Sequence, residues 1–157
     1  MPSLKVDLQT PYEADYLQWI ETTVEKLRSQ DYASVDWENL IEEIEDMERS
    51  ERRSLESNLI VVLLHLLKWQ SQPECRSGSW ESSIIEHRRR ITKALKESPS
   101  LKPYLEGIFA ECYTQAVKQA KAETGLSLET FPMQCAYKLA EVIDDEFLPE
   151  PSTHEQD

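Results

Sequence analysis

Four side chains suited to acid, base or metal chemistry fall on predicted apolar helix faces. On a helical wheel of 100° per residue with Ile44 at zero, two glutamates and one histidine lie within about 60° of the apolar residues. A second histidine lies on the apolar stripe of the next predicted helix. Cores of helical bundles often build sites from facing carboxylates and imidazoles. The candidate polar pocket consists of Glu48, Glu51, His65 and His87.

The same four side chains also have a purely structural interpretation, which we favour. Both histidines can be satisfied inside the core, and the carboxylates can form ion pairs where the stripe approaches solvent. A metal site is disfavoured because the sequence lacks both the paired Glu-x-x-His elements of di-iron bundles and an HExxH motif. The sequence therefore predicts no metal site and no cofactor, and a metal-free pocket remains an alternative.

Two blocks of opposite charge form a second feature of interest. The segment from Asp36 to Glu51 is strongly acidic, whereas the segment from Glu86 to Glu97 is rich in basic residues. The candidate docking patch consists of Arg88, Arg89, Arg90 and Lys93. This patch could bind an acidic partner or nucleic acid, or it could face the acidic block within the molecule. We favour the internal arrangement, since the net charge opposes a polyanion.

Composition limits the class of protein. The chain has 157 residues, with 30 acidic against 17 basic side chains, so its field repels nucleic acid and anionic membranes. The three cysteines form no CxxC pair, which favours reduced thiols in a cytoplasm. The longest apolar run, at residues 59–67, is far shorter than the roughly 20 residues that span a bilayer. With no apolar run at its start either, the sequence predicts a cytoplasmic protein.

The elements that must position these side chains are helices. Glycine is scarce, helix-forming residues are plentiful, and a capping box at Thr10 with Pro11 marks the first helix. Asp36 is the expected cap of a long second helix, which is either straight or kinked near residues 49–54. We predict an all-α, single-domain bundle over residues 1–149 and a disordered tail over 150–157. The five predicted helices cover residues 11–29, 36–70, 80–97, 99–124 and 133–147.

Several stretches together give the chain a family resemblance. They are DYLQWIE, LIEEIEDMERSERRSLESNL, HLLKWQSQP, SWESSIIEHRRRI, FPMQCAY and DDEFLP. With these residues the chain resembles the family called domain of unknown function 29, which consists of bacterial proteins abundant in cyanobacteria. The resemblance covers nearly everything from Tyr12 to Pro149 and implies a helical fold. It implies no activity and therefore assigns no catalytic residue.

These observations favour a small soluble interaction or regulatory protein that acts through partner contacts. An enzyme, or a binder of metal or small ligands with a polar pocket in the core, is the second hypothesis. Weak nucleic-acid binding through the basic patch is the third. An unknown protein partner fits this sequence better than nucleic acid or a membrane. No clean heptad seam supports self-association.

Overall fold

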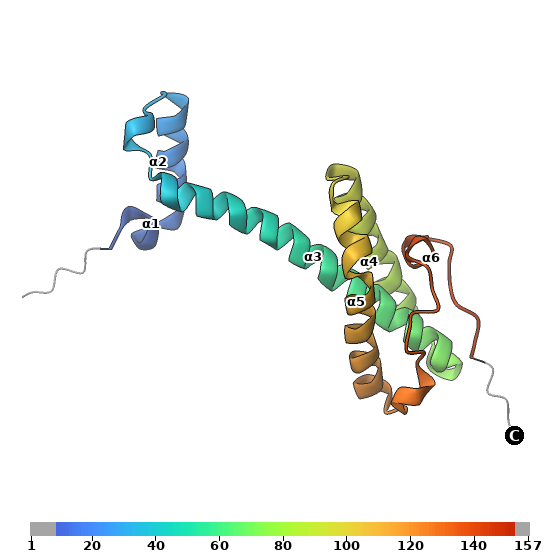
Figure 1. Ribbon diagram of the computed structural model, residues 1–157. Coiled ribbons are helices and arrows are strands. Elements are labelled where there is room, and N and C mark those ends of the chain that lie inside the picture. The colour runs from blue at the N-terminus through green and yellow to red at the C-terminus, as the bar shows by residue number, and fades with distance from the viewer. Residues whose placement is uncertain (1–8, 153–157) are drawn as a thin grey trace, which may run out of the picture. The chain divides into compact units, whose positions relative to one another are not determined.

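A computed structural model describes residues 9–152 of the chain, and within this range it contains helices and no strands (Figure 1). The elements in order are α1 (Pro11–Ala14), α2 (Tyr16–Arg28), the 3-10 turn η1 (Tyr32–Ser34), α3 (Trp37–Ser71), η2 (Pro73–Cys75), α4 (Gly78–Glu97), α5 (Leu101–Thr124), η3 (Leu128–Thr130) and α6 (Leu139–Ile143). The predicted all-helical class is confirmed.

The first predicted helix is two helices. Thr10 forms the expected capping box with Glu13, but α1 ends after one turn at Ala14. Asp15 then takes an extended backbone conformation, and its carboxylate accepts a hydrogen bond from the amide of Gln18 at 3.0 Å. An aspartate in this conformation is a favourable helix start, so the side chain that caps α2 also ends α1.

The long second helix is confirmed as α3, one α-helix without interruption at residues 49–54. Its start is capped by Asp36, whose carboxylate accepts from the amide of Asn39 at 3.3 Å. Its end lies two residues before Pro73, which begins η2 and cannot continue a helical hydrogen-bond ladder. One helix therefore carries most of the acidic block, Glu51 and His65.

The next two helices follow their predicted courses with small shifts. α4 begins at Gly78, two residues earlier than predicted, because the hydroxyl of Ser77 accepts a hydrogen bond from the amide of Trp80 at 3.3 Å. α5 ends at Thr124 and is capped by Gly125, whose φ of 70° is left-handed and whose amide donates to the carbonyl of Lys121. Glycine adopts this conformation without steric cost.

The predicted last helix over residues 133–147 is wrong in extent, because only Leu139–Ile143 is helical. The flanking chain is held by long-range contacts, and the hydroxyl of buried Tyr137 donates to the side chain of Gln70 at the end of α3. The amide of Ser152 donates to the carbonyl of Gln70 at 3.1 Å, so this part of the predicted tail is attached. Residues 153–157 of that tail lie outside the described residues.

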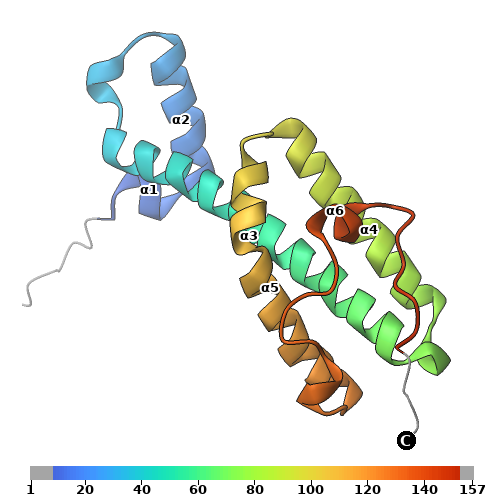
Figure 2. The same ribbon diagram turned by 45° about the vertical axis from the view of Figure 1, so that its right-hand side comes forward.

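Residue contacts divide the chain into two compact units, Met1–Arg49 and Ser50–Asp157, which share α3. In unit 2, the second half of α3 packs with α4 and α5, which lie beside it in both ribbon views (Figure 2). In unit 1, only Trp19, Thr23 and Val35 are buried among residues 9–49. A single domain over residues 1–149 stays a prediction, since the two units share one helix.

Candidate functional site

His65 lies half-buried on the second half of α3. Its Nδ1 donates to the carbonyl oxygen of Val61 at 2.8 Å, which fixes the proton on Nδ1 and leaves Nε2 as the acceptor. Burial lowers the pKa of His65; positive charge on Lys68 and His87 lowers it further, while the Val61 carbonyl and Glu123 oppose the shift. The imidazole is therefore neutral at pH 7.

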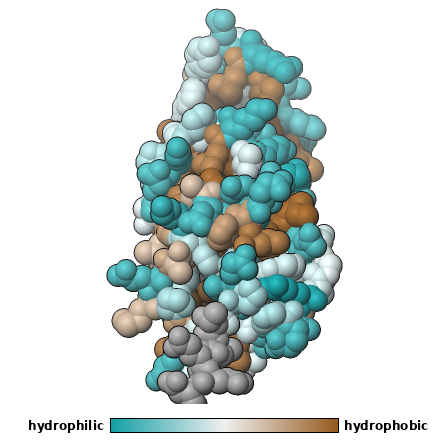
Figure 3. Space-filling view, turned by 90° about the vertical axis from the view of Figure 1, so that its right-hand side faces the viewer, coloured by the Kyte–Doolittle hydropathy of each residue, from teal (hydrophilic) through white to brown (hydrophobic). Residues whose placement is uncertain are grey.

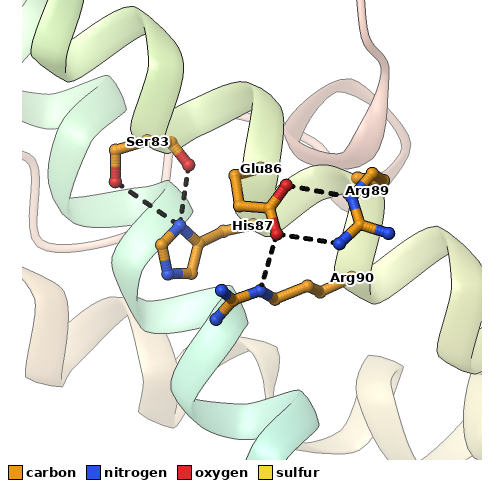
Figure 4. Close-up of polar contacts among 5 residues, drawn as sticks. All are labelled: Ser83, Glu86, His87, Arg89 and Arg90. Carbon is orange, nitrogen blue, oxygen red and sulfur yellow. Dashed lines mark hydrogen bonds and ion pairs between the residues drawn. The ribbon is translucent and has the colours of Figure 1, made fainter.

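His87 lies on α4 and makes the same local contact. Its Nδ1 is 2.7 Å from the carbonyl oxygen of Ser83 and 3.4 Å from the Ser83 hydroxyl (Figure 4). Each histidine is thus bonded to the residue four positions earlier in its own helix. This arrangement satisfies Nδ1 and agrees with the structural interpretation of both side chains.

Lys68 joins the three long helices of unit 2 next to these histidines. Its Nζ is 2.8 Å from Oε2 of Glu123 on α5 and 4.5 Å from the ring centroid of Trp80 on α4. The Lys68 side chain is 13% exposed, whereas the Glu123 side chain is 45% exposed, so the ion pair lies at the edge of the solvent. We call His65, Lys68, Trp80, His87 and Glu123 the histidine cluster.

The two glutamates of the predicted pocket lie elsewhere. Glu51 is exposed and precedes His65 by fourteen residues, which is about 21 Å along α3 at 1.5 Å per residue. Glu48 is exposed one turn earlier, in unit 1. Within unit 2, the structure therefore does not bring Glu51 together with the two histidines, although Glu51 and His65 share one stripe of the helical wheel. Across residues 9–152, no three or more His, Cys, Asp or Glu side chains form a group that could hold a metal ion.

Arg88, a member of the candidate docking patch, is buried and is not available to an external partner. The residue is 1% exposed, and its guanidinium donates to the carbonyl oxygens of Val142 and Phe147, each at 2.8 Å. Burial lowers the pKa of Arg88, opposed by Asp145 and Asp144. Its charge fastens the C-terminal segment to α4, because the guanidinium satisfies carbonyls that no helix ladder satisfies.

The other members of the patch are exposed but paired. Arg89 and Arg90 both contact the carboxylate of Glu86, at 2.8 Å and 3.1 Å, as Figure 4 shows. Hydrogen bonds from these two arginines lower the pKa of Glu86 to about 2. Lys93 lies 3.9 Å from Glu97. These contacts are between residues of α4 itself, and exposed pairs at this spacing contribute little to stability.

In unit 1, Glu43 holds the three helices together. Its carboxylate accepts hydrogen bonds from the hydroxyls of Tyr12 and Tyr16, the second at 2.6 Å. These bonds raise the pKa of both tyrosines, that of Tyr12 to about 12. The rings of Tyr12 and Trp19 meet edge to face with centroids 4.9 Å apart. α1 and α2 therefore cover the side of α3 that carries Glu43.

The sequence predicted an inward stripe on the first half of α3, but most of it is exposed. Ile41 is 53% exposed, Ile44 is 57% exposed and Met47 is 65% exposed. At 100° per residue, Ile41, Ile44 and Met47 lie about 160°, 100° and 40° around the helix from Glu43, so Met47 is close to the covered side and the other two lie away from it. We call Ile41, Ile44 and Met47 the α3 face.

The α3 face lies in a strongly acidic setting. Residues 1–49 contain 13 acidic and 4 basic side chains, and Glu38, Glu42 and Glu45 lie on the same turns of α3.

Exposed apolar side chains are not confined to unit 1, and on the side of the molecule drawn in Figure 3 they form patches bordered by hydrophilic residues. The signal for the α3 face was present in the sequence, but periodicity alone does not say whether a face is covered.

Two of the three cysteines, Cys112 and Cys135, are poorly suited to nucleophilic chemistry. Burial raises the pKa of the Cys112 thiol to about 12 and also raises the pKa of Cys135. A thiolate is the reactive form, so both groups are protonated and inert near neutral pH. Cys112 instead forms part of the core of unit 2.

The geometry defines an all-helical protein with one well-packed unit and one sparsely packed, acidic unit. The family model described as domain of unknown function DUF29 matches residues 11–148, and the chain belongs to this family. Neither the curated proteins nor the solved structures compared with the chain contain a match. No helix among the described residues is both long and apolar enough to cross a membrane.

Proposed function

We propose that the protein acts by binding another protein through the α3 face, as an interaction or regulatory protein. The observation that carries the proposal is the exposure of three large apolar side chains at intervals of three residues along one helix. Burying their exposed halves would contribute about 1 kcal/mol each. Contiguous apolar residues bordered by charged ones are typical of protein interaction sites.

The proposed activity needs no cofactor, and we place it in the cytoplasm. Cys75, Cys112 and Cys135 are all unpaired, which supports a reducing compartment. Nucleic-acid binding is a weaker proposal because Arg88 is buried, while Arg89 and Arg90 already contact Glu86. A small-ligand function for the histidine cluster remains an alternative without a specific observation in its favour.

Photocrosslinking in native cells tests the proposal. A photoreactive amino acid replaces Ile44, and the matched control replaces Ile85, an isoleucine on α4 that is 58% exposed. We expect a discrete protein adduct from position 44 that is absent from position 85. An added Ile41→Glu substitution should remove that adduct, because a charge on the same face cannot be buried without cost. Equal adducts from both positions, or none from position 44, would contradict the proposal.

A further inference from the structure

Unit 2 contains a groove whose properties complement those of the α3 face. It has a volume of about 750 Å³ and lies between α5 and residues 128–133, which comprise η3 and the segment that follows it. Its apolar lining consists of Tyr113, Val117, Leu128, Phe131, Pro132 and Met133. Leu128 is 55% exposed and Met133 is fully exposed, so two of these side chains are available to an incoming apolar surface.

Two lysines supply the charge of this groove. Lys118 and Lys121 also line it, one turn apart on α5. Within residues 9–152, neither ammonium group makes a hydrogen bond or an ion pair. Thr114 and Glu129 complete the lining, so the cations outnumber the single carboxylate. The groove therefore suits a ligand that is both apolar and acidic.

The chain itself carries a helix with that chemistry. Helices that dock in apolar grooves insert anchors at intervals of three, four and seven residues. Trp37, Ile41 and Ile44 have the intervals of four and seven, and Met47 follows three residues later. Pairing two copies of unit 1 would instead bring together two segments that each have 13 acidic and 4 basic residues, which electrostatics opposes.

We propose that the α3 face of one copy binds the groove of a second copy, with Ile41, Ile44 and Met47 against the apolar lining. Carboxylates beside the face then approach Lys118 and Lys121. The inference rests on the proposed function, that the α3 face binds a protein, and names the partner as this chain. If each of two copies binds its α3 face to the groove of the other copy, the smallest closed assembly is a dimer.

Sedimentation velocity over a range of concentrations tests this interface on the full-length protein. We expect wild type to associate reversibly, and Ile44→Glu to raise the dissociation constant by at least about tenfold, because one buried anchor can dominate an interface. On the groove side, Leu128→Asp and the fully exposed Met133→Asp should have the same effect. The matched control Ile85→Glu should associate like wild type. Circular dichroism on each variant verifies that the helices remain folded.

Mixing two defective variants identifies which surfaces meet. Ile44→Glu retains an intact groove and Leu128→Asp retains an intact α3 face, so an equimolar mixture should form heterodimers through one remaining interface. Association should also weaken as salt rises, since the lysine and glutamate charges are exposed. If Ile44→Glu alone disrupts the assembly and the mixture does not associate, copies pair through unit 1 and the inference fails.

The failure of this inference is separable from the failure of the proposed function. A wild-type protein that stays monomeric at all concentrations, together with a crosslink from position 44 to a different protein, refutes self-association and retains partner binding. A monomeric wild type without any position-specific crosslink refutes both. A crosslink from position 44 to a peptide of residues 113–133 in a second copy supports both.

Discussion

The two halves of α3 have similar helical patterns and opposite surroundings. Among the described residues, nineteen of the twenty-one buried hydrophobic side chains belong to unit 2, and all nineteen form one core cluster. Eight of the twelve exposed large hydrophobic side chains belong to unit 1. Helical periodicity is therefore expressed in both units, but only unit 2 has enough partner helices to cover its apolar stripe.

The contrast indicates where stability and binding are located. Stability comes from burying apolar surface against other elements, so unit 2 supplies most of it. Unit 1 keeps apolar surface in water, which costs solubility unless a partner covers it. A division of this kind predicts that substitutions in the two halves of the same helix affect different measurements.

The largest expected effect comes from truncating a core side chain of α3. Leu63 is 0% exposed, and Leu63→Ala should lower the free energy of unfolding by about 3 kcal/mol through lost burial and a residual cavity. Ile44→Ala on the same helix is the matched control and should change it by less than about 0.5 kcal/mol. Urea denaturation followed by circular dichroism measures both. Equal losses of unfolding free energy in the two variants would show that both halves of α3 are equally packed, which would contradict the difference between the two units.

The next effect concerns the attachment of the C-terminal segment within unit 2. Arg88→Met keeps much of the side-chain volume but leaves the carbonyls of Val142 and Phe147 without their donor. We expect a loss of about 3 kcal/mol in unfolding free energy, with earlier proteolytic cleavage near residues 138–148.

The control for this prediction is Arg89→Met, since Arg89 is exposed and contacts only Glu86 of the same helix. In urea denaturation, Arg89→Met should change the free energy of unfolding by less than about 0.5 kcal/mol. A similar result for both arginines would mean that the buried guanidinium does not fasten this segment.

Sequence reasoning found the elements because their signals are local. The cap at Thr10, the long run to Ser71 and the left-handed Gly125 are each set by a few neighbouring residues. The last helix was overextended because its apolar spacing continues through residues 133–147. In the structure, Arg88 donates to the carbonyl oxygens of Val142 and Phe147, and the Tyr137 hydroxyl donates to Gln70. Contacts with residues distant in the sequence therefore replace the helix ladder there.

The candidate site was harder to predict because it depends on coverage rather than on spacing. The helical wheel places Glu51 and His65 on one stripe, but the stripe runs from an exposed environment at Glu51 to a half-buried one at His65. Arg88 was misassigned for the opposite reason, since its carbonyl partners are more than fifty residues away in the sequence. No local sequence pattern shows whether an apolar stripe is covered or whether an arginine has partners far away in the sequence.

The smallest expected effect is a pH dependence that unit 2 owes to His65. Because burial lowers the pKa of His65 below its ordinary value of 6.5, the unfolded chain binds a proton at this site before the folded chain does. The free energy of unfolding should therefore decrease as the pH falls below about 6.5, and it should no longer depend on His65 above about pH 7.5.

Urea titrations below about pH 6.5 and above about pH 7.5 measure this decrease in wild type and in His65→Gln. The variant should lose less stability on acidification than wild type or than His87→Gln, which removes an imidazole from the neighbouring helix. An identical decrease in all three proteins would mean that the buried environment of His65 does not distinguish its two protonation states, and that the histidine cluster is more open to water than the core around it.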